Sequence, residues 1–178
     1  KGDLAIKSGL YDGDGAYSSH VVNYYTRTIA SNSVLVYDPN EQFGPWRGLH
    51  YPEVLNDGGQ RADRGDNQEY KSVEHWLQFK DRQDTGDILH YEHTADYTYV
   101  YGDATNAYNN PRYVAPKEGM FLGRNRPKIS LFTRELVYLR PDTVVIFDRV
   151  NAMEPSHQKK WLLHFLNRPA VTGKETIV

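Results

Sequence analysis

The residues from Tyr17 to Asn32 have side chains that could bind a polar substrate and move protons. Three tyrosines, one histidine, one arginine and two asparagines lie within these sixteen residues, a mixture that packing alone does not require. A tyrosine hydroxyl or a histidine ring can exchange protons, and an arginine can hold a carboxylate or a sulfate through two hydrogen bonds. The segment therefore predicts a polar face that handles a substrate.

Two predicted strands flank this segment. Residues 33–37 are β-branched and apolar, and the Asp-Pro-Asn sequence after them is a turn that ends the strand. Another short strand is expected over residues 2–9, followed by a glycine-rich turn over residues 12–15. The Asp-Gly pairs of that turn favour a tight reversal over a calcium loop, because the further acidic ligands are missing.

The end of the chain has the clearest β pattern. Residues 129–139 and 143–150 are rich in β-branched and apolar side chains, and an Arg-Pro-Asp turn separates them. A third strand is predicted over residues 160–166. Strands that follow one another through short turns form antiparallel sheets.

The middle of the chain adds one clear strand. Residues 94–101 alternate with period two, which places three tyrosines on one side. Residues 73–79 and 87–93 fit either a strand or a short helical turn, and no helix-period stretch longer than about ten residues is present. We therefore predict an all-β fold, an antiparallel β-sandwich, in a single domain over residues 1–178.

A long loop is predicted between these parts, over residues 39–67. It contains an Asn-Asp-Gly-Gly sequence, which is a strong turn signal. Its arginines, Arg47, Arg61 and Arg64, either face an anionic substrate or are solvated surface charges. The sequence leaves both alternatives open.

Composition excludes several classes of function. The net charge of −2 and the absence of a basic stripe argue against nucleic acid as a partner, and no apolar run is long enough to cross a membrane. There is no cysteine, so the fold uses no disulfide. The 14 tyrosines suit a sugar ligand, since the ring packs on a pyranose and the hydroxyl bonds its edge, but tyrosine is also a good strand former.

Three segments carry a family resemblance. Residues 4–11, 24–30 and 56–61 resemble the heparinase II/III-like polysaccharide lyases, closest to the heparinase II branch, and residues 136–166 extend the similarity. Lyases of this family have an N-terminal helical toroid followed by stacked antiparallel sheets. The resemblance implies that the chain is the sheet part only, a fragment of a longer multidomain protein that also has the helical domain.

The resemblance implies an activity and residues for it. These enzymes cleave a uronate-containing glycan by β-elimination, which needs a base, an acid for the leaving oxygen and positive charge at the carboxylate. Tyr17 stands where the family has its catalytic tyrosine, and Tyr11 competes for that role or contacts substrate. His20 and Arg27 would bind substrate. The alternatives are that the tyrosines only pack the loop, that His20 is incidental and that Arg27 lies in a buried hydrogen-bond network.

The resemblance also bears on cofactors. Relatives often bind zinc through an aspartate where this chain has Lys7 and a histidine where it has Ser31, together with a histidine upstream. Neither lysine nor serine suits zinc, and His50 could replace only one ligand, so we expect no metal or other cofactor. A second metal-like pair, His90 and His93, would point to opposite faces of a strand.

Three functions are therefore considered. The first is the sheet domain of a secreted or periplasmic bacterial lyase that acts on an acidic polysaccharide such as heparin or heparan sulfate. The second is a carbohydrate-binding or structural β-sandwich without catalysis, which the departures at Lys7 and Ser31 favour. The third is a secreted interaction module without a sugar ligand. Under the first, we expect the isolated chain to be inactive, because the helical domain supplies half of the cleft.

Overall fold

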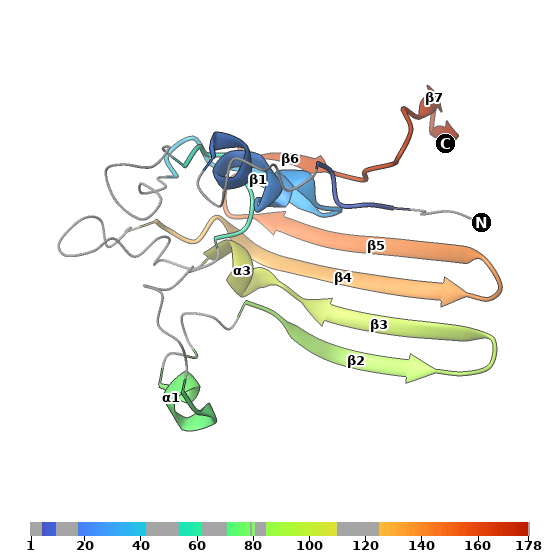
Figure 1. Cartoon of the computed structure of the whole chain (residues 1–178), viewed down its shortest axis with the longest axis horizontal. Coiled ribbons are helices and arrows are strands. Elements are labelled where there is room, and N and C mark those ends of the chain that lie inside the picture. Colours follow the sequence, from blue (N-terminus) through green and yellow to red (C-terminus); the bar gives the residue numbers. More distant parts are fainter. Residues whose placement is uncertain are drawn as a thin grey trace.

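The computed structural model describes residues 5–9, 18–41, 54–61, 71–78, 80, 85–109 and 125–177. Its strands form antiparallel sheets, and its helices are short (Figure 1). The prediction of an all-β fold built from antiparallel sheets is confirmed.

The largest sheet has four strands in the order β2-β3-β4-β5. Its strands are β2 (Asp87–His93), β3 (Tyr97–Asp103), β4 (Ile129–Leu139) and β5 (Thr143–Ala152). The predicted strands in the middle and at the end of the chain are confirmed, and the ambiguous residues 87–93 are extended. Tyr97, Tyr99 and Tyr101 are opposite Leu139, Val137 and Glu135, which places the three tyrosines on one face as the alternation predicts.

Two small sheets complete the β-structure. β1 (Val34–Tyr37) pairs with β6 (Gln158–Trp161), and β7 (Ala170–Thr172) pairs with β8 (Glu175–Ile177). The short helices are η1 (Val21–Tyr25), η2 (Thr28–Ala30), α1 (Val73–Leu77) and α3 (Thr105–Asn109). In Figure 1, β1, β6 and the two η-helices gather beside β5 at one end of the large sheet.

Two predicted strands differ in the structure. The strand expected over residues 160–166 begins earlier, at Gln158, and ends at Trp161, because the backbone beyond it bonds to irregular segments instead of to β1. Of the strand expected over residues 2–9, the described residues 5–9 are not a strand. They are still anchored: Ile6 N donates to the His164 carbonyl at 3.1 Å, and Ser8 N donates to the Ala30 carbonyl at 2.9 Å.

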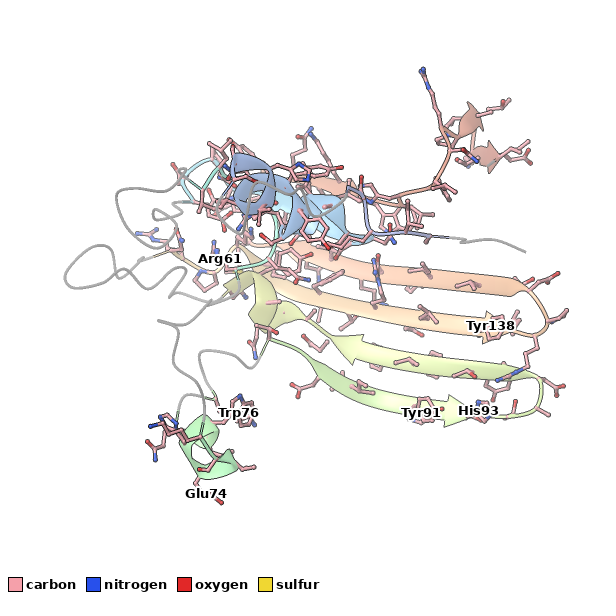
Figure 2. All side chains as sticks on the ribbon, in the orientation of Figure 1. Arg61, Glu74, Trp76, Tyr91, His93 and Tyr138 are labelled. Atoms are coloured by element: carbon pink, nitrogen blue, oxygen red, sulfur yellow. The ribbon has the colours of Figure 1, made fainter. Side chains whose placement is uncertain are left out.

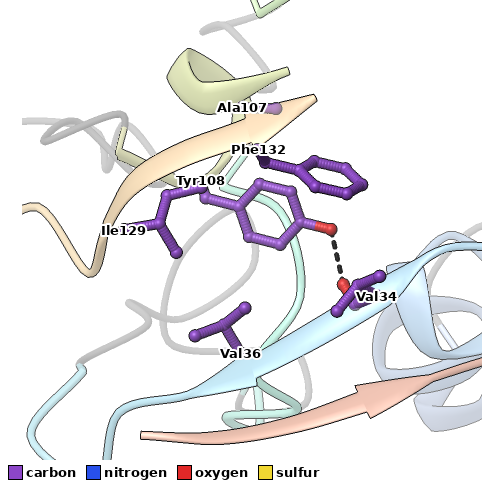
Figure 3. Close-up of a cluster of buried hydrophobic side chains, with 6 residues drawn as sticks. All are labelled: Val34, Val36, Ala107, Tyr108, Ile129 and Phe132. Atoms are coloured by element: carbon purple, nitrogen blue, oxygen red, sulfur yellow. Dashed lines mark hydrogen bonds between the residues drawn. The ribbon is translucent and has the colours of Figure 1, made fainter. Parts of the chain in front are cut away.

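A small apolar core joins β1 to the large sheet (Figure 3). Its members come from β1, α3 and β4 and are Val34, Val36, Ala107, Tyr108, Ile129 and Phe132. The Tyr108 ring meets Phe132 edge-on at 5.2 Å, and its hydroxyl donates to the Val34 carbonyl at 2.5 Å. Tyr108 therefore buries its ring while its polar atom keeps a hydrogen bond, as a buried tyrosine requires.

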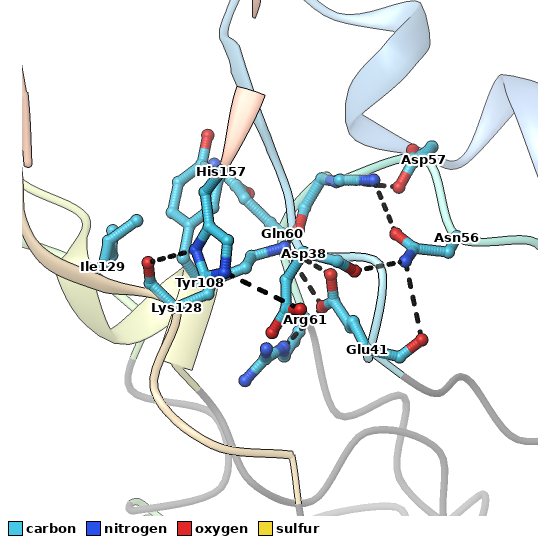
Figure 4. A network of polar contacts seen from close by, with 12 residues as sticks. Asp38, Glu41, Asn56, Asp57, Gln60, Arg61, Tyr108, Lys128, Ile129 and His157 are labelled. Carbon is cyan, nitrogen blue, oxygen red and sulfur yellow. Dashed lines mark hydrogen bonds and ion pairs between the residues drawn. The ribbon is translucent and has the colours of Figure 1, made fainter. Parts of the chain in front are cut away.

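A buried charge cluster lies beside this core (Figure 4). Lys128 Nζ donates to both carboxylate oxygens of Glu41, at 3.0 and 2.8 Å, and to the Gly59 carbonyl at 2.7 Å. Arg61 Nε donates to the same carboxylate at 2.5 Å, and all three charged side chains are fully buried. Arg61 therefore neither faces a substrate nor is solvated, which corrects both sequence-based alternatives. The cluster fixes the turn at residues 56–59 to the start of β4.

Candidate functional site

A π-helix presents the candidate histidine and two tyrosines. In η1, the Thr26 N–H donates to the Val21 carbonyl five residues earlier at 3.2 Å, and the Thr26 hydroxyl donates to the same oxygen at 2.8 Å. Val21 and Val22 are buried, whereas His20, Tyr24 and Tyr25 are only half-buried. Short π-helical turns are rare and are frequent at functional sites.

These side chains meet residues from two other segments. We call the group the polar–aromatic cluster, and its members are Lys7, Ser8, His20, Tyr24, Tyr25 and Ser31. The His20 ring lies 5.5 Å from the Tyr24 ring and stacks on the Tyr25 ring at 6.5 Å. The Tyr24 hydroxyl is hydrogen-bonded to the Ser8 hydroxyl at 2.6 Å. A histidine and two tyrosines, groups that can exchange protons, are thus in mutual contact.

Lys7 brings a positive charge to the same place. Its Nζ lies 5.2 Å from the centre of the Tyr25 ring and donates to the Ser31 hydroxyl at 3.2 Å. The Lys7 side chain is exposed, so an anion could reach the ammonium from solvent. The cluster therefore combines an accessible cation with aromatic rings and a histidine.

Gly9 allows the close approach of these segments. Its φ of +77° is in the left-handed region, and a Cβ there would lie 3.0 Å from the Tyr24 ring and 3.4 Å from the His20 ring. Glycine is the residue that adopts this conformation without strain. The segment around Ser8 can therefore pack directly against the two rings.

Asn32 is the anchor of the cluster. Its side chain donates to the Ile6 carbonyl at 3.2 Å and accepts from the His164 N–H at 2.8 Å, and its carbonyl accepts from Arg134 Nη1 at 2.7 Å. Asn32, which follows Ser31 in the chain, thus connects three parts of the molecule: the segment around Lys7, the residues after β6, and strand β4. The structural interpretation of Asn32 is the one that its contacts support.

Arg27 lies away from the accessible face. It is 4% exposed, and its Nη2 donates to Asp57 Oδ1 at 2.6 Å. Of the two sequence-based interpretations, these contacts favour the buried hydrogen-bond network over direct contact with a substrate. Asp57 also accepts from the Gly59 N–H at 2.8 Å, so the pair holds the turn at residues 56–59 against η2.

The remaining candidates divide into two groups. Tyr17, Tyr11 and His50 lie outside the described residues. His20 is described and belongs to the polar–aromatic cluster, so its substrate contact stays a prediction with a defined location.

The two positions that the resemblance links to zinc are neighbours in space. Lys7 and Ser31 bond each other, 24 residues apart in the chain. His90 and His93 point to opposite faces of β2, since they are opposite Tyr101 and Thr98 on β3. Among the described residues, no group of three or more histidine, aspartate or glutamate side chains is placed to hold a metal ion, and no helix is long and apolar enough to cross a membrane.

Except for His20, no member of the cluster is predicted as a site residue from the sequence; the others are Lys7, Ser8, Tyr24, Tyr25 and Ser31. A partial signal exists for Tyr24, because it follows His20 by four residues and a helical turn brings such positions onto one side. The contribution of Lys7 and Ser8 depends on a contact with a distant segment, which the sequence does not indicate.

The cluster could bind an anionic, hydroxyl-rich ligand, with the ammonium of Lys7 at the anion and the tyrosine rings against apolar ring faces. No family model matches the chain, and no curated protein is similar to it. The geometry and chemistry of the cluster are therefore the grounds on which a function can be proposed.

Proposed function

We propose that the chain is the sheet domain of a polysaccharide lyase that cleaves a uronate-containing acidic glycan, of the heparin or heparan sulfate type, by β-elimination. One observation carries this proposal. The Lys7 ammonium, the Tyr25 ring and the His20 ring meet at one accessible place, and His20 follows Tyr17 by three residues in the chain. The reaction requires a base, an acid for the leaving oxygen and positive charge at the carboxylate, and the cluster offers a positive charge and proton-exchanging groups, with aromatic surface for the sugar ring.

The chemistry assigns a task to each group. A base removes the proton on C5 of the uronate, the electron pair forms the C4–C5 double bond, the bond from C4 to the glycosidic oxygen breaks, and that oxygen takes a proton. Lys7 would bind the uronate carboxylate and stabilise the charge that develops there. By the resemblance, Tyr17 would protonate the leaving oxygen, and His20 would orient the sugar.

Lys7 takes the cationic role that the sequence suggests for Arg27. Arg27 is buried against Asp57, whereas the Lys7 side chain is exposed. The Ser31 hydroxyl and the Tyr25 ring hold the ammonium without neutralising it, because neither is charged. An exposed ammonium that is held by these two uncharged groups is suited to a carboxylate or a sulfate.

Binding of a heparin oligosaccharide by the 178-residue chain tests the proposal. Lys7→Glu places a negative charge under the ligand and should weaken binding roughly tenfold or more, as measured by isothermal titration at low salt. Lys174→Glu, at the exposed turn between β7 and β8, makes the same change of charge away from the cluster and is the matched control. An equal loss of affinity in both variants would show that binding depends on net charge alone, and would contradict a site at Lys7.

A second candidate function is a carbohydrate-binding module without catalysis. The tyrosines of β3 favour it, because the Tyr97 hydroxyl donates to Glu92 at 2.6 Å and the Tyr99 hydroxyl donates to Glu135 at 2.9 Å. These hydrogen bonds raise the pKa of both tyrosines, which makes them poor proton donors. Binding without the unsaturated product, in the intact protein, would support this candidate.

A further inference from the structure

β2 is an edge strand with little protection against pairing. It is the outermost strand of the large sheet, and all seven of its residues are exposed. In Figure 1, no strand of the described chain lies on its outer side. Native edge strands are usually protected by charged side chains, above all lysine, by proline, by bulges or by a cover; β2 has neither lysine nor proline, and its irregularity is confined to the residues between Ile88 and His90. Its outer N–H and C=O groups are therefore a template for another strand.

The opposite edge of the sheet is different. β5 lies next to the layer that contains β6, and Trp161 of β6 donates from Nε1 to Asp148 of β5 at 2.9 Å. Of the two edges, β2 is therefore the one that is open among the described residues. The irregularity of β2 lies between Ile88 and His90, so the register is regular from His90 to His93.

The sequence of this regular part is complementary to itself. If two copies of β2 pair antiparallel about Tyr91, His90 is opposite Glu92 of the second copy, and Glu92 is opposite the second copy's His90. Opposite residues of an antiparallel pair lie on one face. His90 and Glu92 satisfy this condition, since both share the face of Tyr101 and Tyr99, and Tyr91 shares the other face with Val100.

The side chains are already placed for these contacts. Glu92 accepts from the Tyr97 hydroxyl through Oε1, which fixes the carboxylate and leaves Oε2 for a second donor. The His90 ring lies 5.7 Å from the Tyr99 ring, which holds it on the same face. Tyr91 is 61% exposed and would pack against its own copy across the axis (Figure 2). Hydrogen-bonded polar pairs and aromatic pairs on opposite residues stabilise neighbouring strands.

We propose that β2 pairs antiparallel with β2 of a second copy of this chain, which joins the two four-stranded sheets into one continuous sheet of eight strands. The partner is a second copy because the pairing of a His90 ring nitrogen with the Glu92 carboxylate is satisfied twice by the same two residues, and Tyr91 meets its own copy between them. This interface is separate from the polar–aromatic cluster and goes beyond the proposed function.

Charge reversal at the seam tests the proposal by sedimentation velocity over a range of concentrations. The wild-type chain should dimerise reversibly. His90→Glu places two carboxylates opposite each other twice, and Glu92→Lys twice removes the carboxylate that would accept from His90, so each should raise the dimer dissociation constant about tenfold or more. Lys174→Glu should leave the dissociation constant unchanged. Circular dichroism of each variant checks that the strands still form.

Two further experiments test the register of the pairing between the two β2 strands. The double variant His90→Glu with Glu92→Lys places opposite charges across the seam twice and should dimerise again. A mixture of the two single variants should form a mixed dimer, because the carboxylate from His90→Glu then faces the ammonium from Glu92→Lys, and the native His90 faces the native Glu92. Both rescues are expected only for an antiparallel seam centred on Tyr91. A wild-type chain that stays monomeric at every concentration, a dimer that His90→Glu leaves intact, or a failure of the mixed dimer would overturn the proposal.

Discussion

Arg27 and Lys7 show at the scale of single residues how a sequence can indicate a charge but not its place. Arg27 has the side chain best suited to a carboxylate, but it is buried in an ion pair with Asp57. The sequence indicates Lys7 only as a replaced metal ligand, but the residue presents an exposed ammonium beside Tyr25. Burial depends on contacts across many residues, so residue type alone does not decide which cation meets a ligand.

Truncation of these two residues should therefore affect stability to very different extents. Arg27→Ala leaves Asp57 buried without its cation and should lower the free energy of unfolding by roughly 3–5 kcal/mol. Lys7→Ala removes an exposed side chain and should change the free energy of unfolding by no more than about 0.5 kcal/mol. Urea denaturation of the two variants measures the difference. Similar losses in both would show that Arg27 is not a structural residue.

Lys128 should make stability depend on pH. Burial lowers the pKa of its ammonium from 10.5 to about 8 in the folded protein, although Glu41 opposes the shift. Between these two pKa values the unfolded chain binds more protons, so the free energy of unfolding should rise with pH from about 8 to 10.5. The free energy of unfolding should rise by roughly 3 kcal/mol in total, because each unit of difference between the two pKa values corresponds to about 1.4 kcal/mol.

The comparison with Lys128→Met isolates this contribution. The other titrating groups, including Tyr108, whose pKa burial raises, are present in both proteins and cancel in the difference. The wild-type protein should therefore gain stability relative to the variant as the pH increases. If urea denaturation gives a difference that does not change between pH 7 and 10, Lys128 does not titrate as its burial implies.

At the scale of elements, local pattern predicts the large sheet well and the segments around it less well. β3, β4 and β5 follow from alternation and β-branched runs, and β2 is the extended alternative of an ambiguous segment. The predicted turn at residues 56–59 is confirmed by Gly58, whose φ is +75°. The π-helix over residues 21–25 has no period that distinguishes it from a loop, and its packing on Val21 and Val22 decides its conformation.

Substitutions at two glycines in turns distinguish the effect of backbone strain from the effect of steric contact. Gly173 has a φ of +62° with open space around it, so Gly173→Ala should lower the free energy of unfolding by only about 1–2 kcal/mol. Gly58 has a similar φ, but a Cβ there would lie 3.0 Å from backbone atoms of Tyr37 in β1. Gly58→Ala should therefore cost about 1–3 kcal/mol more. Equal losses in thermal or urea unfolding would mean that the turn moves away from β1 without cost.

At the scale of the whole molecule, the candidate site depends on contacts that link distant parts of the chain. Asn32 meets His164 across 132 residues, and Ser8 meets Tyr24 across 16. The sequence predicts that the segment from Tyr17 to Asn32 handles a substrate and locates His20 in it. It does not predict that Lys7 and Ser8 complete the cluster, because irregular segments carry no periodicity from which their neighbours follow.

We propose that this chain belongs to a lyase, and the formation of the unsaturated uronate tests this proposal most directly. That product absorbs in the ultraviolet, so the intact protein that contains the chain is incubated with heparin, heparan sulfate and other uronate polymers while absorbance is recorded. We predict that absorbance rises, that Tyr17→Phe lowers turnover by about 100-fold or more with little change in binding, and that Tyr11→Phe stays within several-fold. Binding of these polymers with no rise in absorbance on any of them would contradict the claim.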